Sequence, residues 1–122
     1  IAYIFDLLGR RHDLDFKTIS KIIAAPLWKD IDRLDGEKAE LLRALRVTYG
    51  SALINGPYAL IIGREGTMVG MNDRIKLRPL VAGREGDMVY MASEEAGIRE
   101  VCPQPDEVWS PRAGEPVIGR VR

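Results

Sequence analysis

The beginning of the chain has the hydrophobic spacing of an amphipathic helix. Apolar side chains recur three and four residues apart at Ile1, Ile4, Phe5 and Leu8. This spacing places them on one face of a helix. Because the pattern is already under way at the first residue, we expect the chain to start inside a helix and to be part of a longer domain. Arg10, Arg11 and His12 follow in the last turn, where cations interact favourably with the helix dipole.

A second, short helix is predicted to follow. Asp13 or Asp15 supplies its N-terminal cap, because a carboxylate accepts hydrogen bonds from the first free N–H groups of a helix. Its apolar face is formed by Phe16, Ile19 and Ile23. Pro26 ends the helix, since proline cannot continue the hydrogen-bond ladder.

A third helix is predicted over residues 37–49, after a loop that runs through Trp28 and Asp35-Gly36. The stripe expected to be buried consists of Ala39, Leu42, Leu45 and Tyr49. Gly50 is the expected stop signal. The first fifty residues therefore form a helical segment.

After Gly50 the pattern changes to short apolar runs separated by turns that contain glycine, which is typical of strands. The sequence GREGTMVGM at 63–71 returns at 83–91 as GREGDMVYM, with seven of nine positions identical. An apolar run precedes each copy and another closes it. We expect two antiparallel hairpins, with the glycines of each copy at positions of positive φ.

The end of the chain is predicted to hold one short helix and a last strand. Ser93 is the expected cap of the helix, with Glu94 and Glu95 in its first turn, and Cys102-Pro103 ends it. Residues 111–114 form a turn and residues 115–121 a strand.

Composition then limits the class of protein. Of the 122 residues, 46% are hydrophobic and 30% are charged, with 18 basic against 18 acidic side chains. This balance is typical of one globular domain and excludes a disordered chain and a strongly basic nucleic-acid-binding protein. No apolar run approaches the ~20 residues that span a bilayer. The single Cys102 excludes an internal disulfide and fits a reducing compartment, so we expect a cytoplasmic protein with neither nucleic acid nor membrane as partner.

The residues give no catalytic set. His12 is the only histidine and lies in a basic helix end, and Cys102 precedes a proline in an ordinary loop. One histidine, one cysteine and scattered carboxylates do not have metal-ligand spacing, and the adjacent Glu94 and Glu95 point in different directions. The sequence therefore assigns no catalytic, cofactor-binding or metal-binding residue within 1–122.

The polar connector at 72–79, which links the two hairpins, is the most unusual segment. Its plain interpretation is a solvated link. Alternatively, Arg78 lies at the sheet surface, where its planar guanidinium satisfies carbonyl groups or a carboxylate. We expect a structural role here rather than contact with a substrate.

Four motifs now stand in a recognisable order: NGPYAL at 55–60, Asp73-Arg74 with LRPL at 77–80, ASEE at 92–95, and PRAGE at 111–115. This order resembles a class II glutamine amidotransferase domain, and it looks most like the amidotransferase part of archaeal-type glutamate synthase. The resemblance covers nearly the whole chain. Each motif by itself is common, so the order of the four carries the resemblance.

The resemblance implies an α+β fold, the four-layer αββα sandwich of N-terminal-nucleophile hydrolases, of which this chain is the later half. Residues 1–122 are then a single partial domain, with a helical segment at 1–50 and a hairpin segment with one short helix at 51–122. In that family an N-terminal cysteine, with its own α-amino group as base, hydrolyses glutamine to glutamate and ammonia. The ammonia then serves glutamate synthesis from 2-oxoglutarate.

The family's nucleophile, substrate arginine and oxyanion Asn-Gly pair all belong to the earlier half of the domain. Asn55-Gly56 corresponds to the strand motif and not to that pair. The implied partners are the missing N-terminal half, a glutamate synthase domain or subunit, and glutamine as substrate of the complete domain. FMN, an iron–sulfur cluster and NADPH are expected in associated synthase domains or subunits, and no cofactor is expected in this chain.

One residue departs from the family pattern. Lys76 stands in the connector where glycine is usual, so the turn must either avoid positive φ or tolerate strain. This weakens a second interpretation, an amidophosphoribosyltransferase-like domain. A third interpretation is a non-catalytic assembly or binding module, because the chain contains no catalytic set.

Overall fold

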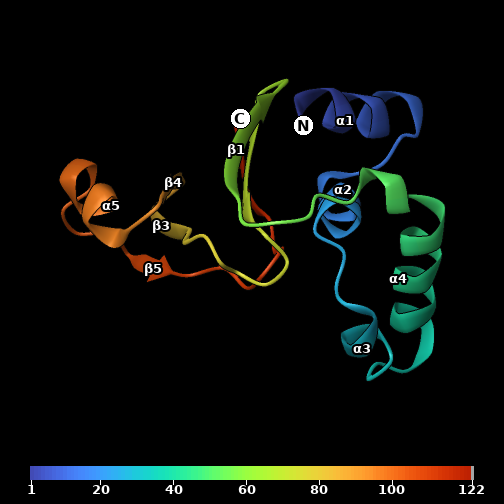
Figure 1. Cartoon of the computed structure of the whole chain (residues 1–122). Coiled ribbons are helices and arrows are strands. Elements are labelled where there is room, and N and C mark those ends of the chain that lie inside the picture. Colours follow the sequence, from blue (N-terminus) through green and yellow to red (C-terminus); the bar gives the residue numbers. More distant parts are fainter. Residues whose placement is uncertain (122) are drawn as a thin grey trace.

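The computed structural model describes residues 1–121, and its helical first part precedes a part made of strands and one short helix, as the sequence predicts (Figure 1). The helical elements of the first part are α1 (Ala2–Asp6), the π-helix η1 (Leu7–Arg11), α2 (Phe16–Ile23), α3 (Trp28–Ile31), α4 (Gly36–Thr48) and the 3-10 helix η2 (Gly50–Ala52). The fold class is α+β.

The N-terminal helix is confirmed. It runs through α1 into η1, and its apolar residues Phe5 and Leu8 are almost completely buried. Asp15, and not Asp13, caps the next helix: its Oδ1 accepts a hydrogen bond of 2.7 Å from the N–H of Thr18. That backbone donor lowers the pKa of the Asp15 carboxyl. Asp13 has a φ of 52° and belongs to the preceding link.

The loop predicted through Trp28 contains a short helix, α3, which the sequence analysis missed. Its first turn forms because the Leu27 carbonyl accepts hydrogen bonds from the N–H groups of Asp30 and Ile31. Ile31 anchors the turn, since its side chain has no exposed surface. Helix α4 lies where it was predicted, with Ala39, Leu42 and Leu45 buried and Tyr49 partly buried.

Six strands form two antiparallel sheets. Strands β1 (Ala59–Arg64), β2 (Thr67–Asn72) and β6 (Val117–Arg120) make one sheet in the order β1-β2-β6. Strands β3 (Val81–Glu85), β4 (Met88–Ala92) and β5 (Glu107–Trp109) make the other in the order β4-β3-β5. Both hairpins and the last strand are confirmed, whereas β5 was not predicted.

The short helix α5 (Glu95–Val101) begins one residue later than predicted, because Glu94 and not Ser93 is its N-cap. Glu94 makes no capping hydrogen bond through its side chain. The Glu95 carboxylate instead pairs with Arg99 one turn on, at 2.6 Å. The helix ends before Cys102, as predicted.

The two copies of the repeat make different turns. Pairing of Arg64 with Thr67 leaves Glu65-Gly66 as the first turn, and both residues have positive φ (46° and 72°). Pairing of Glu85 with Met88 leaves residues 86 and 87 as the second turn, in which Gly86 alone has positive φ, at 53°. The identical GREG segment thus supplies a turn one residue later in the second copy.

The first glycine of each copy was expected to have positive φ, and this is wrong. Gly63 and Gly83 lie inside β1 and β3, with ordinary strand conformations. Gly83 has a packing reason: a Cβ atom at this position would lie 2.9 Å from Cγ2 of Ile98. Glycine therefore allows α5 to approach β3 closely.

The packing places the first helices, the two sheets and α5 in succession (Figure 1). Leu60, Ile62 and Met71 of the first sheet pack against the helical core that contains Phe5 and Ile19. On the opposite face of that sheet, Met91 of β4 lies directly over Gly70. The Ile98 side chain then covers the outer side of the second sheet at Gly83.

Candidate functional site

The connector between the hairpins is organised around one buried carboxylate. Asp73 has no exposed surface. Its two oxygens accept hydrogen bonds from the backbone N–H groups of Tyr58, Ile75, Leu77 and Arg78, at 3.0 to 3.3 Å. Burial by itself would raise the pKa of this carboxyl, but the four backbone donors hold it below its usual range. Asp73 is therefore ionised and fixes the connector to the start of β1.

The neighbouring Asn72 completes this arrangement from the other side. Its Nδ2 donates to the carbonyl oxygen of Arg78 at 3.3 Å, and its side chain is completely buried. The N–H of Asp73 donates to the carbonyl of Tyr58 at 2.9 Å. The connector is therefore exposed over residues 75–79 but anchored by two buried polar side chains at its start.

The arginine that satisfies carbonyl groups is Arg74 and not Arg78, which corrects the sequence expectation. Arg78 is exposed, and in the described part of the chain its guanidinium makes no hydrogen bond or ion pair; its backbone serves the loop instead. Arg74 donates through Nη2 to Oδ1 of Asn55 at 2.8 Å and through Nη1 to the carbonyl of Ala25 at 3.4 Å. It joins the loop before β1 to the end of α2.

Lys76 adopts a positive φ, so the turn tolerates strain rather than avoiding it, which is one of the two outcomes expected from the sequence. Its φ is 56°, in the left-handed region that costs a non-glycine residue about 1 to 2 kcal/mol. Its N–H donates to the carbonyl of Asp73 at 3.0 Å, so the turn is held closed despite this conformation. The exposed side chain plays no part in the closure.

We therefore expect Lys76→Gly to raise the free energy of unfolding by about 0.5 kcal/mol, because relief of the strain exceeds the extra chain entropy of glycine. Urea denaturation measures the change. Lys76→Ala is the matched control, since it removes the same side chain but keeps Cβ. An equal gain in both variants would show that the charge, and not the backbone, causes the effect.

A second arginine approaches the same segment from α4. Arg46 donates through Nη1 to the carbonyl of Pro26, and its guanidinium lies 4.6 Å from the ring centre of Trp28. Burial, and then the positive charge of Arg74, lower the pKa of Arg46. Two cations from different elements therefore lie near one another beside residues 25 and 26.

The Tyr58 hydroxyl is buried within electrostatic range of Arg74 and has no hydrogen-bond partner among residues 1–121. Burial, and after it the charge of Asp73, raise its pKa to about 12, although the charge of Arg74 acts in the opposite direction. Tyr58 stays protonated at neutral pH and is a free hydrogen-bond donor.

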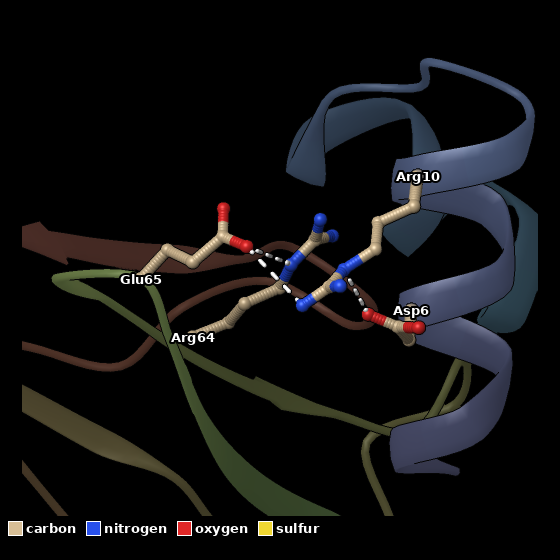
Figure 2. Close-up of polar contacts among 4 residues, drawn as sticks. All are labelled: Asp6, Arg10, Arg64 and Glu65. Carbon is tan, nitrogen blue, oxygen red and sulfur yellow. Dashed lines mark hydrogen bonds and ion pairs between the residues drawn. The ribbon is translucent and has the colours of Figure 1, made fainter.

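A separate ion-pair cluster docks the β1–β2 turn on the N-terminal helix (Figure 2). Arg10 pairs with Asp6 at 2.7 Å and with Glu65 at 3.3 Å, and Nε of Arg64 lies 3.8 Å from the same Glu65 carboxylate. The Arg64 guanidinium rests on the helix at Gly9, where a Cβ atom would collide with it. The cluster as a whole contains two positive and two negative side chains, and most of them are exposed. We therefore assign it a role in holding the β1–β2 turn against the N-terminal helix.

The other residues considered from the sequence lie elsewhere and have structural surroundings. Cys102 is 2% exposed, and burial raises the pKa of its thiol, which makes it a poor nucleophile. The ring of His12 contacts Tyr49, with Nδ1 3.3 Å from the hydroxyl. No three or more His, Cys, Asp or Glu side chains gather as a metal site within residues 1–121.

Neither Arg46 nor Tyr58 was predicted from the sequence as a site residue, and Asp73 was assigned no role of its own. Asp73 carried a usable signal, because an Asp in a link often accepts hydrogen bonds from N–H groups a few residues on. Arg46 carried no such signal, since it is one of two arginines, with Arg43, among the polar residues of helix α4. Only the crossing of α4 over Pro26 brings it to Arg74.

Within the described residues, no helix has the length and apolar character needed to cross a bilayer. No family model matches the chain, and no solved structure matches it. Over all 122 residues it is 48% identical to a protein of Archaeoglobus fulgidus that is described as an uncharacterized protein. The chain covers 32% of that relative, and so spans about a third of its length.

Proposed function

We propose that the chain is part of a class II glutamine amidotransferase domain of the archaeal glutamate synthase type. The full-length protein would hydrolyse glutamine to glutamate and ammonia, and the ammonia would serve glutamate synthesis from 2-oxoglutarate in the cytoplasm. The observation that carries this proposal is the order of the four motifs at 55–60, 73–80, 92–95 and 111–115. The protein would then be an enzyme whose nucleophile lies outside these residues.

The structural role of the motifs supports the proposal. The motif at 55–60 leads into β1, and the motif at 73–80 forms the connector that folds around the buried Asp73. The motif at 92–95 leads from β4 into α5, and the one at 111–115 forms the turn before β6. Each motif thus sits at a junction of elements, where residue identity is most restricted by backbone geometry.

The order of packing also supports the finer fold that we propose, an N-terminal-nucleophile hydrolase sandwich. Helices pack on one face of the first sheet, Met91 of the second sheet packs on the other face at Gly70, and Ile98 of α5 packs outside the second sheet. This is the order of layers that the resemblance implies. The partners in the proposal are the remainder of the domain and a synthase domain or subunit with FMN, an iron–sulfur cluster and NADPH.

Labelling of the full-length protein with a diazo-ketone analogue of glutamine tests the proposal. We expect the intact mass to shift by one label, and an excess of glutamine to protect against it. The shift should persist in Cys102→Ser, because that thiol is buried and its thiolate is disfavoured. It should disappear when the N-terminal cysteine is replaced by serine.

Two outcomes would contradict the proposal. A label that maps to Cys102 would show simple alkylation of an accessible thiol. No label together with no release of ammonia from glutamine would favour the non-catalytic assembly module instead.

A further inference from the structure

Arg46 and Arg74 are cations without a carboxylate partner. No Asp or Glu oxygen of the described chain lies within 4 Å of either guanidinium, whereas Arg10, Arg43 and Arg99 all have such partners. Asp73, which directly precedes Arg74, accepts hydrogen bonds from backbone N–H groups and does not bond to the guanidinium. Neither guanidinium is therefore paired directly with a carboxylate, and the nearest negative charge is that of the ionised Asp73, which acts on the same Tyr58 as Arg74 does.

Both guanidinium groups are held in place by fixed acceptors. Arg46 donates to the carbonyl of Pro26, and Arg74 donates to the adjacent carbonyl of Ala25. The ring of Trp28 stacks on Arg46, and Asn55 holds Arg74. These contacts use only part of the N–H groups of each guanidinium, so donors remain free on both side chains.

The surroundings offer further donors. The Tyr58 hydroxyl is buried without a partner among residues 1–121, and it is close enough to Arg74 for the arginine's charge to lower its pKa. The Asn55 amide accepts from Arg74 through its oxygen, which leaves its Nδ2 hydrogens available. A buried polar group without a partner is uncommon, and a bound ion, water or ligand is one way to satisfy it; Oδ1 of Asn72 and Nε of Arg64 are the other such atoms among the described residues.

We propose that Arg46 and Arg74 together bind a small oxoanion, a carboxylate or a phosphate, beside residues 25 and 26. Planar guanidinium groups match the paired oxygens of these anions, and such charge-assisted hydrogen bonds are the strong ones. A bound anion would also offset the repulsion between the two cations. The inference does not depend on glutamine hydrolysis, so it stands or falls separately from the proposed function.

Isothermal titration calorimetry of the full-length protein at low salt tests the site, with inorganic phosphate and succinate as separate probes. We expect saturable binding of at least one probe. Arg46→Gln should weaken it about tenfold or more, because a charge-assisted hydrogen-bonded pair is lost. Tighter binding of phosphate identifies a phosphate-bearing ligand, and tighter binding of succinate identifies a carboxylate; either supports the proposal.

Arg43→Gln is the matched control. Arg43 lies on the same helix three residues earlier but is already paired with Asp32, at 3.5 Å. Its replacement should leave the affinity unchanged. Arg46→Lys, which keeps the charge but not the planar fork, should weaken binding without loss of fold, and thermal unfolding checks the fold of every variant. No saturable binding of either probe, or an equal loss of affinity in Arg43→Gln, would overturn the proposal.

Discussion

Asp73→Asn lowers the free energy of unfolding by about 3 kcal/mol in our expectation. The carboxylate accepts from four backbone N–H groups in a fully buried position. An asparagine can offer only one oxygen to these donors, and its NH₂ group faces them as a further donor. Each buried donor left without an acceptor costs about 1 to 3 kcal/mol.

Urea denaturation of Asp73→Asn measures this loss. Asp13→Asn is the control, because Asp13 is exposed and its positive φ suits asparagine as well as aspartate. The control should change stability by less than about 0.5 kcal/mol. Similar stability of the two variants would mean that the connector does not depend on the carboxylate.

The same contacts predict how stability changes with pH. The pKa of Asp73 is lower in the folded protein than its ordinary value of 3.8. The folded state therefore favours the ionised form, and this contribution is fully present above pH 3.8 and is lost as the pH falls through the folded pKa. In Asp73→Asn this part of the acid destabilisation should be absent.

Gly114→Ala is the second large effect that we expect, a loss of about 2 to 4 kcal/mol. Gly114 has a φ of 66°, and a Cβ atom there would lie 2.8 Å from Cβ and 3.1 Å from the carbonyl oxygen of Ala24. The strained backbone and the collision with a buried helix end add together. Neither contact can be relieved by rotation of a side chain, because both atoms are fixed by the backbone.

Gly36→Ala separates the two causes. Gly36 also has a positive φ, of 70°, but nothing lies within 4 Å of a Cβ atom there. The control should therefore lose only the backbone contribution of about 1 kcal/mol. Thermal unfolding of both variants measures the difference, and equal losses would show that the last turn does not pack against Ala24 in solution.

Periodicity predicted most of the fold. The helices and the two hairpins were found because their apolar residues repeat with the spacing of a helix or lie in short runs between turns. Helix α3 and strand β5 were missed because each has only three or four residues and too few apolar positions to show a period. Tertiary contacts decide such elements: Ile31 is buried, and β5 pairs with β3.

The turns of the two hairpins show a second limit of prediction from local sequence. Both copies of GREG contain the same residues, yet Glu65 lies in a turn and Glu85 in a strand. The pairing of each hairpin is set by which side chains its two faces bury, and that depends on neighbours outside the repeat. Local sequence therefore located both turns but could not place them to a single residue.

The arrangement around Asp73 and Arg74 was the least predictable part. Its residues come from the segment after α2, from α4, from the link before β1 and from the connector. Arg78 was singled out because it stands beside a proline, but only its backbone contributes. Which of several arginines meets a distant carbonyl depends on how helices cross, and no local pattern reports that.

The buried carboxylate also determines strand alignment. Asp73 directly follows β2, and its carboxylate accepts a hydrogen bond from the N–H of Tyr58, which directly precedes β1. A slip of β1 by one residue would carry that N–H out of reach and turn Leu60 and Ile62 away from the helical core. The β1–β2 hairpin is thus fixed at both ends, by the Glu65-Gly66 turn at one end and by the hydrogen bond between Tyr58 and Asp73 at the other. Only one alignment of the two strands allows both.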